Sequence, residues 1–362
     1  MLPERNKFSF MLSFSGRANF LKQFKAININ DTGIKGYPLV YAEHLLDHLD
    51  YYASIYEQMF ALAVKAAQKP PASLTVLDFG CGNGFLGMFA KIYGFKKVWL
   101  CDRSAEFLVA SEKTAAAAGI DINGFIEGDA EAVNRYFAQT GERPDIILAS
   151  DVIEHIYDLD EFFRHLHSLN PSLISVFTTA SNPFNVIKTR SLHKMQYRDE
   201  WIGYADLTKE ECEQKGCSPL SFLEQRKQII RQNFPQLTEQ AVSALAQETR
   251  GKELKEIISS VQDYVDSGTM PVPPVDPYWV CDPYTGSWTE RILPLQVYRK
   301  TFRQHGYSLS CFNGFYNPFS SKLIKKVAIA YVNGLIKRTN KIGRYIAPYI
   351  VLVGVPAKSI KS

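Results

Sequence analysis

The sequence lacks most of the features that mark specialised classes of protein. No stretch reaches 18 uninterrupted apolar residues, which argues against a transmembrane helix. Internal repeats and low-complexity tracts are also missing. The six cysteines form no CxxC pair and have no nearby histidine at zinc-finger spacing, so we expect free thiols in a reducing cytoplasm. The apolar run between Met1 and Phe24 is broken by polar residues and lacks a small-residue cleavage site, so we expect no signal peptide.

The whole chain has no large excess of positive or negative charge, but one local segment does. The 41 Lys and Arg exceed the 37 Asp and Glu by only four, which excludes a uniformly basic nucleic-acid binder. Residues 321–362, however, carry nine Lys and Arg and no acid. Removing those nine from the 41 leaves 32 Lys and Arg against 37 acids. The sequence therefore predicts an acidic body with a basic C-terminal end.

The chain has 362 residues, 46% of them hydrophobic, which is enough for a large core and excludes disorder as the main state. Residues 38–69 have helical periodicity. Short apolar runs then alternate with helical patterns through the next hundred residues. We predict strands at 74–79, 97–101, 124–127, 146–149 and 172–178, separated by helices at 85–93, 106–118, 130–139 and 159–169. Such alternation is typical of a parallel sheet with helices on both faces.

The alternation stops near residue 182, and helical patterns without strands continue to about 294. There we predict helices starting after the N-cap Ser218 with Pro219 at the first position, and at 238–249 and 252–265. A helix at 295–305, a strand at 307–313, a basic helix at 320–339 and a strand at 348–355 follow. The predicted fold is α/β: a Rossmann-like, seven-stranded, mostly parallel sheet with an inserted α-helical cap. Its segments are a helical N-terminus (1–70), the core (71–182), the cap (183–292) and the final core elements with the basic helix (293–362).

The most informative segment is a glycine loop after the first strand. Gly82, Gly84 and Gly87 fit the dinucleotide pattern GxGxxG, whereas Asp78 with Gly80, Gly82 and Gly84 fits DxGxGxG. Glycines admit a ligand close to the backbone, and the following helix N-terminus offers free N–H groups. A carboxylate at Asp78 would repel a pyrophosphate but would attract an ammonium group. The loop therefore favours a cationic ligand.

Further acids follow the next strands. Asp102 ends the second strand, Asp129 follows the third and Asp151 follows the fourth. The carboxyl ends of parallel strands form the ligand crevice of such a sheet. With these four matches in order, residues 40–180 resemble the class I S-adenosylmethionine-dependent methyltransferases, of the small-molecule type that includes the ubiquinone-biosynthesis O-methyltransferases.

The resemblance implies roles for individual residues. The methionine end of S-adenosyl-L-methionine would lie against Asp78, Gly80, Gly82 and Gly84, the ribose against Asp102, and the adenine against Asp129 and Ala130. Cys81, Asn83, Arg103 and Asp151 complete the expected cofactor-binding set. The implied reaction is an SN2 methyl transfer to an oxygen or nitrogen of a small or medium-sized acceptor, including a glycan- or lipid-linked one, held under the cap.

The stretch Asp151, Glu154 and His155 follows the fourth predicted strand. On a helix these residues share one face. His155 with Glu154 could supply acid–base catalysis, the three could bind a divalent metal, or they could hold the cofactor loop. The stretch resembles the E-x-x-E-H motif of the small-RNA 3′-end ribose methyltransferases, with Asp151 in place of the first Glu. That family has a further His before a Trp-Thr pair, and the matching stretch 201–208 has none, so we expect no metal.

An aromatic segment between residues 270 and 291 offers candidate substrate contacts. Tyr278, Trp279, Asp282 and Trp288 could line an acceptor pocket, or the segment could be a proline-stiffened linker with buried aromatics. The cap carries more Asp and Glu than Lys and Arg, which argues against a nucleic-acid acceptor.

The basic helix at 320–341 has two interpretations. Its lysines could be solvated around a helix packed on the sheet edge, or they could dock the chain on an anionic membrane surface or an acidic partner. We therefore predict a cytoplasmic methyltransferase, free or peripheral at a membrane. The alternatives are a metal-dependent RNA ribose 2′-O-methyltransferase, a non-catalytic cofactor-binding scaffold, and an NAD oxidoreductase.

Overall fold

The computed structural model describes residues 16–319 and 322–357, which divide into two compact units. Unit 1 comprises the chain up to Ile153, Leu159–Ala180 and the chain from Leu295 onwards. Unit 2 comprises Glu154–Asp158 and Ser181–Pro294. The prediction about a signal peptide falls mainly on residues 1–15, which lie outside the described residues, as do Lys358, Lys361 and the predicted start of the basic helix at residue 320.

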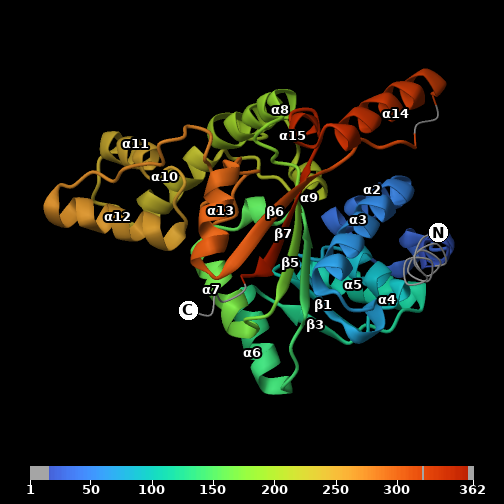
Figure 1. Ribbon diagram of the computed structural model, residues 1–362. Coiled ribbons are helices and arrows are strands. Elements are labelled where there is room, and N and C mark those ends of the chain that lie inside the picture. Colours follow the sequence, from blue (N-terminus) through green and yellow to red (C-terminus); the bar gives the residue numbers. More distant parts are fainter. Residues whose placement is uncertain (1–15, 320–321, 358–362) are drawn as a thin grey trace. The chain divides into compact units, whose positions relative to one another are not determined.

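Unit 1 is built on a seven-stranded sheet with the strand order β3-β2-β1-β4-β5-β7-β6 (Figure 1). Strands β1 to β5 pair in parallel, and β7 runs antiparallel to both β5 and β6. The predicted fold class is therefore confirmed. The strands are β1 Thr75–Phe79, β2 Lys97–Asp102, β3 Gly124–Glu127, β4 Ile146–Ser150, β5 Ile174–Thr179, β6 Tyr307–Asn313 and β7 Ile350–Pro356.

Helices connect these strands as the alternating pattern requires. Residues 16–25 are helical. The helices that follow in unit 1 are α2 Gly36–Asp47, α3 Leu49–Ala67, α4 Phe85–Tyr93, α5 Ala105–Ala118, α6 Ala130–Thr140, α7 Leu159–Leu169, α13 Leu295–Gln304, α14 Leu323–Arg338 and α15 Asn340–Gly343. The predicted helix over 38–69 is two helices, because the backbone of His48 leaves the helical conformation between α2 and α3.

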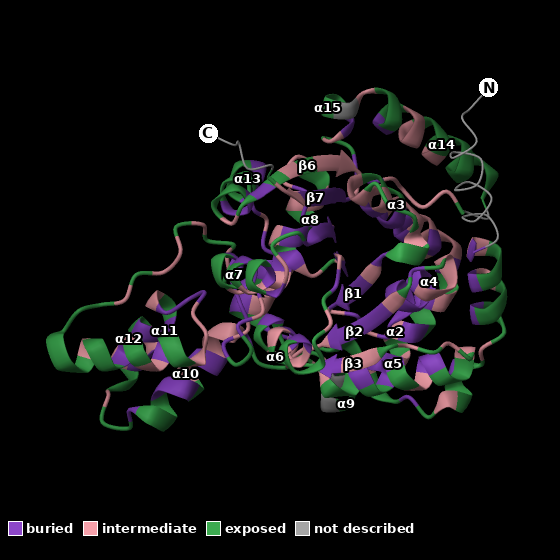
Figure 2. Ribbon diagram, turned by 60° about the horizontal axis from the view of Figure 1, so that its bottom comes forward, coloured by how far each residue is buried: buried purple, intermediate pink, exposed green. Residues whose placement is uncertain are grey.

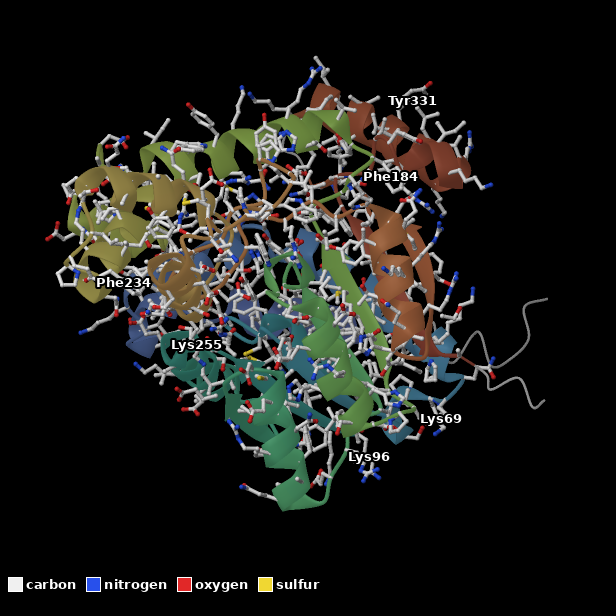
Figure 3. All side chains as sticks on the ribbon, turned by 90° about the vertical axis from the view of Figure 1, so that its left-hand side faces the viewer. Lys69, Lys96, Phe184, Phe234, Lys255 and Tyr331 are labelled. Carbon is white, nitrogen blue, oxygen red and sulfur yellow. The ribbon has the colours of Figure 1, made fainter. Side chains whose placement is uncertain are left out.

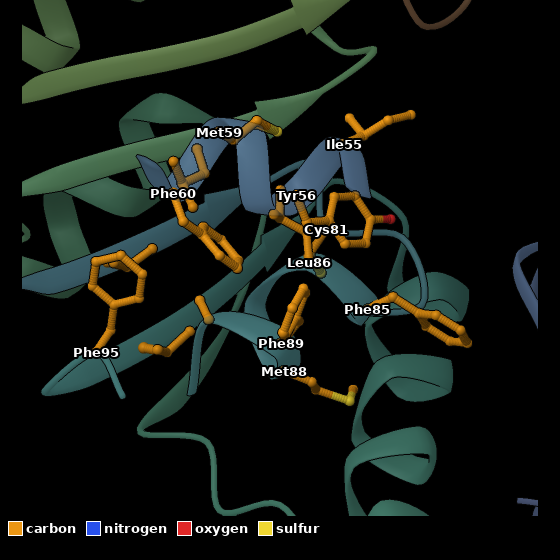
Figure 4. Close-up of a cluster of buried hydrophobic side chains, with 14 of the residues drawn as sticks. Ile55, Tyr56, Met59, Phe60, Cys81, Phe85, Leu86, Met88, Phe89 and Phe95 are labelled. Atoms are coloured by element: carbon orange, nitrogen blue, oxygen red, sulfur yellow. The ribbon is translucent and has the colours of Figure 1, made fainter. Parts of the chain in front are cut away.

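Both faces of the sheet are buried, as Figure 2 shows for the central strands. Successive side chains of a strand point to opposite faces. On one face, Val76 joins a core that contains Phe60 of α3 and Phe89 of α4 (Figure 4). On the other, Phe79 packs against Phe162 of α7 at 5.2 Å between ring centroids. This two-sided burial explains why the strands read as continuous apolar runs.

Unit 2 is helical. Its elements are α8 Val186–Tyr197, the π-helical turn η4 Arg198–Ile202, α9 Lys209–Lys215, α10 Phe222–Asn233, α11 Glu239–Glu248 and α12 Leu254–Ser267. Phe234 at the end of α10, labelled in Figure 3, belongs to a small core with Leu245 of α11 and Ile257 of α12. The buried Arg226 of α10 pairs through both terminal nitrogens with the buried Glu200 of η4. Among the described residues, no helix has both the length and the hydropathy needed to cross a bilayer.

The predicted start of the first long cap helix is wrong. Ser221, not Ser218, is the N-cap of α10, and its hydroxyl accepts the N–H of Glu224 at 3.2 Å. Pro219 lies in a preceding turn, where its carbonyl accepts the N–H of Tyr204 at 3.1 Å. This tertiary hydrogen bond holds Pro219 outside the helix, although its local pattern suits a first helical position.

Candidate functional site

The glycine loop links β1 to α4 and is held against the end of β2. Gly80, Gly82 and Gly84 have φ values of 69°, 51° and 78°, a region that residues with a Cβ rarely adopt. The N–H groups of Gly80 and Cys81 donate to the carbonyl of Cys101 at 2.8 and 2.9 Å. The predicted loop residues therefore come together in one tight turn whose conformation depends on glycine.

Asp78 lies at the base of this loop and is almost fully buried, with 1% of its surface exposed. Its Oδ2 accepts the N–H of Gly87 in α4 at 2.8 Å. Burial raises the pKa of Asp78 to about 7, although the hydrogen bond from Gly87 opposes this shift. A cation beside Asp78 would favour the ionised form, which suits the predicted ammonium ligand.

Asp102 is the last residue of β2 and forms hydrogen bonds with the glycine loop, with Ser104 and with Gly128. Its Oδ2 accepts the N–H of Gly82 at 2.8 Å and its Oδ1 accepts the N–H of Ser104 at 2.9 Å. Burial raises the pKa of Asp102, while these N–H groups and the charge of Arg103 lower it. The backbone carbonyl of Asp102 also accepts the N–H of Gly128, which brings the ends of β2 and β3 together.

Asp129 is the N-cap of α6. Its Oδ1 accepts the N–H groups of Glu131 and Ala132 at 3.0 and 3.1 Å. These bonds orient the carboxylate and leave Oδ2 for a further donor. Ala130, the first residue of α6, is buried. The third predicted acid thus lies at the same edge of the sheet as Asp78 and Asp102.

The structure corrects the prediction for Asp151, Glu154 and His155. Asp151 has φ of +54°, and only the three residues Ile153–His155 form a short 3-10 helix. A residue in the left-handed region cannot lie inside an α-helix, so the three side chains do not share a helical face. Asp151 is held at the end of β5 instead: its N–H donates to the carbonyl of Thr178 at 3.1 Å, and its Oδ1 accepts the N–H of Ala180 at 2.9 Å.

Sequence reasoning missed the tyrosines that cover the glycine loop. Tyr41 of α2 and Tyr52 and Tyr56 of α3 line a cavity of about 30 Å³ together with Asp78 and Ser150. A Cβ on Gly82 would lie 3.3 Å from Cε1 of Tyr41. Burial and the charge of Asp151 raise the pKa of Tyr52 to about 12, so its hydroxyl stays protonated. The signal in the sequence was the four-residue spacing of Tyr52 and Tyr56, which places both side chains on one face of a helix. That spacing does not show which part of the protein the face covers.

His155 has a defined set of partners within unit 2. Its Nδ1 lies 2.7 Å from the carbonyl oxygen of Trp288. Because a carbonyl can only accept, Nδ1 carries the proton and the Nε2 of a neutral ring is an acceptor. Oε1 of Glu290 lies 4.0 Å from Nε2, and Oε2 of Glu290 accepts the hydroxyl of Ser181 at 2.9 Å. Glu290 itself has an unusual φ of +46°.

The other predicted catalytic residue, Glu154, differs from His155 in exposure. Glu154 is fully buried, and its carbonyl accepts the N–H of Arg291 at 3.3 Å. His155 is about one-third exposed, with 36% of its side chain accessible. Glu290, which the sequence did not single out as catalytic, has a carboxylate oxygen 4.0 Å from Nε2 of the imidazole.

The predicted substrate residues take different positions. Tyr278 stacks on His193 of α8, with ring centroids 3.7 Å apart, beside a cavity of about 380 Å³. Trp279 is half-buried and lies 6.5 Å from Trp288 between ring centroids. Oδ1 of Asp282 accepts two N–H groups in its own turn, from Tyr284 and Thr285.

The side chain of Trp288 is buried within unit 2. Its ring stacks on that of Tyr157 at 5.5 Å, and its Nε1 donates to the carbonyl of Tyr157 at 3.0 Å. Of the four predicted substrate residues, Tyr278 lines the cavity beside α8.

Comparison with known proteins shows which family the segment with the glycine loop is similar to. Residues 51–211 match the family model described as "Methyltransferase domain". This part of the chain is therefore similar to a methyltransferase domain. Its matched range contains the glycine loop, Asp102, Asp129 and Asp151, the residues assembled at the carboxyl edge of the sheet.

Curated proteins that are similar to this segment match it over part of their own length. The ubiquinone biosynthesis O-methyltransferase of Azorhizobium caulinodans is 32% identical over 31% of this chain and 42% of its own length. The ribosomal protein L11 methyltransferase of Prochlorococcus marinus is 31% identical over 30% of this chain and 36% of its own. The chain thus spans less than half of the length of these relatives. A putative S-adenosylmethionine-dependent methyltransferase structure from Listeria monocytogenes aligns over 84% of this chain and 96% of its own, with 14% identity and a TM-score of 0.41.

The residues of this matched segment fit S-adenosyl-L-methionine. A buried carboxylate at Asp78 suits the ammonium group, and the loop glycines leave the backbone open to close approach. Asp102, at the end of β2, offers carboxylate oxygens that can accept hydroxyl donors. The carboxylate of Asp78, in contrast, would repel the pyrophosphate of a dinucleotide.

Proposed function

We propose that the chain is an S-adenosylmethionine-dependent methyltransferase that acts on an oxygen or nitrogen of a small or medium-sized acceptor. The observation that carries the proposal is the buried carboxylate of Asp78 beneath the glycine loop of a methyltransferase domain. S-adenosyl-L-methionine supplies an electrophilic methyl group on a sulfonium, which an acceptor atom attacks in line. The protein's contribution is therefore mainly positioning and exclusion of water.

In this proposal the chain's own groups divide the work. Asp78 and the loop N–H groups hold the methionine end, and Asp102 holds the ribose. Tyr41, Tyr52 and Tyr56 cover the loop and exclude water from it. The cavity that they line has a volume of about 30 Å³ and is also bordered by Gly80 and Ser150.

We further propose that His155 removes the proton of the acceptor. Its Nδ1 donates to the carbonyl of Trp288, which leaves Nε2 as the base, and Oε1 of Glu290 lies 4.0 Å from Nε2. Only three residues separate His155 from Asp151, so the chain itself keeps their Cα atoms within about 14 Å. A cytoplasmic location stays a prediction.

The test is calorimetric titration of the purified chain with S-adenosylhomocysteine. We expect a dissociation constant in the range of about 1 μM to 1 mM, the usual range for enzyme ligands. Titration with NADH is the matched control and should show no binding. Binding of NADH instead of S-adenosylhomocysteine would overturn the proposal. Transfer of labelled methyl groups to acceptor fractions, with and without a chelator, then separates this function from a scaffold and from a metal-dependent enzyme.

A further inference from the structure

Helix α14 packs on unit 1 with only part of its surface. Ile329, Val332 and Ile336 recur at spacings of three and four and form its inner stripe; Ile336 is 3% exposed. Asn333 on the same side exchanges two hydrogen bonds of 2.8 Å with the backbone of Tyr316. The side of α14 that carries these residues is therefore the side that packs against the rest of unit 1.

A second apolar stripe lies on the opposite side of α14 and is exposed. Ile324, Val327, Tyr331 and Leu335 follow at spacings of three, four and four, and their exposed fractions are 88%, 62%, 69% and 36%. Figure 3 labels Tyr331 in this stripe. A contiguous exposed apolar surface on a folded protein indicates a site of interaction. Packing among the described residues of unit 1 does not explain it, because these four side chains stay exposed there.

The lysines at the start of α14 are the second observation. Lys325 and Lys326 lie in the first turns of the helix, which contain no acid. Cations at a helix N-terminus are unfavourable, because that end carries the positive pole of the helix dipole. Neither lysine forms an ion pair with any described residue. Lys337 and Arg338, in contrast, lie in the last turn, where the dipole favours them.

We propose that α14 docks on the surface of an anionic lipid bilayer. The exposed stripe would enter the boundary between headgroups and acyl chains, and Lys325 and Lys326 would meet lipid phosphates. Nine cations and no acid over residues 321–362 match a surface of uniformly negative charge. The same charges oppose pairing with a second copy, and a nucleic acid would leave the apolar stripe unexplained. At 16 residues, α14 lies on the bilayer and does not cross it.

This inference does not depend on methyl transfer, so the two proposals fail separately. Loss of lipid binding leaves the binding of S-adenosylhomocysteine intact, and the reverse also holds. The titration described above therefore serves as the folding control for every variant below.

The experiment is co-sedimentation of the full chain with vesicles. We expect binding to phosphatidylglycerol mixed with phosphatidylcholine, and little binding to phosphatidylcholine alone. Lys325→Glu with Lys326→Glu should weaken binding by about tenfold or more, since each basic residue near such a surface contributes about 1 kcal/mol. Lys65→Glu with Lys69→Glu, two exposed lysines at the end of α3, makes the same charge change elsewhere and should have a much smaller effect.

The apolar stripe is tested in the same assay. Ile324→Ser with Tyr331→Ser should weaken binding by about tenfold or more, because both side chains would be buried in the lipid. Val109→Ser with Val297→Ser, exposed positions on α5 and α13, is the control. Absence of binding to the anionic vesicles overturns the proposal. So does a lipid-free dimer, seen by light scattering, that dissociates in the Ile324 and Tyr331 variant.

Discussion

Oδ2 of Asp78 accepts the backbone N–H of Gly87 at 2.8 Å, which ties the end of β1 to the first turn of α4. The contact is this short because Gly87 has no side chain: a Cβ there would lie 2.2 Å from Cδ2 of Leu100 and 3.0 Å from Oδ2 of Asp78. The hydrogen bond orients the carboxylate but leaves it in an environment where burial raises its pKa to about 7.

Ligand affinity should therefore depend on the ionisation of Asp78. Protonated Asp78 cannot attract an ammonium group, so the affinity for S-adenosylhomocysteine should rise as pH increases and level off above about 7. The rise should approach about tenfold per pH unit, the limit for one ionising group. In Asp78→Asn the affinity should be lower and the profile flat. Calorimetry across this range checks it, and a flat wild-type profile would contradict the assignment.

The same shift predicts the opposite trend for the unfolding of the free chain. The pKa of Asp78 is higher in the folded chain than the 3.8 of an exposed aspartate, so folding favours the protonated form. Its contribution to the free energy of unfolding is fully present below about pH 4 and is lost as the pH rises through about 7. In urea unfolding, the difference formed by subtracting the free energy of unfolding of Asp78→Asn from that of the wild type should fall as the pH rises from about 4 to about 7. A difference that grows with pH would show that the carboxylate is stabilised in the fold.

Asp102 should contribute to cofactor binding through both of its oxygens. Asp102→Ala removes the acceptor of the Gly82 N–H and the expected ribose partner, so affinity for S-adenosylhomocysteine should fall about tenfold or more. Asp121→Ala, an exposed aspartate beyond α5, is the control and should leave affinity unchanged. If calorimetry gave Asp102→Ala the wild-type dissociation constant, the ribose role would be wrong.

His155 should affect turnover without affecting cofactor binding. His155→Ala should lower kcat by about 10²–10⁴-fold, the usual contribution of a general base. Release of S-adenosylhomocysteine in the presence of an acceptor measures kcat, and calorimetry measures affinity. His167→Ala, an exposed histidine of α7, should change neither. A kcat for His155→Ala close to that of the wild type would assign His155 a structural role through its bond to Trp288.

The ion pair between Arg226 and Glu200 should dominate the stability of unit 2. Both side chains are fully buried, so Arg226→Met leaves an uncompensated carboxylate and should cost about 3–5 kcal/mol. Replacing both residues with Met should cost less, because no charge is left buried. Arg231→Met breaks an exposed pair with Glu239 that solvent screens, so it should cost far less than Arg226→Met. Urea unfolding measures all three, and equal costs for Arg226→Met and Arg231→Met would contradict the argument.

The cofactor loop could be predicted because its signals are local. Glycines at fixed spacing after an apolar run specify a turn into a helix, and parallel strands must end at the same edge. Asp78, Asp102 and Asp129 were therefore placed together from sequence. Asp151 was assigned to a helix because its spacing to His155 is helical, whereas hydrogen bonds to β5, nearly thirty residues away, hold it in a left-handed conformation.

The sequence by itself determined the order of strands and helices, the glycine loop and the acids that follow the strands, since these depend on short-range periodicity and turn chemistry. Only the tertiary structure decided that Tyr41 and Tyr52 cover the loop, that Glu290 lies beside His155, and that α14 leaves an apolar stripe exposed. The physical reason is the same in each case. A periodic pattern shows which face of an element is apolar or polar, but the partner of that face depends on packing between segments far apart in the chain.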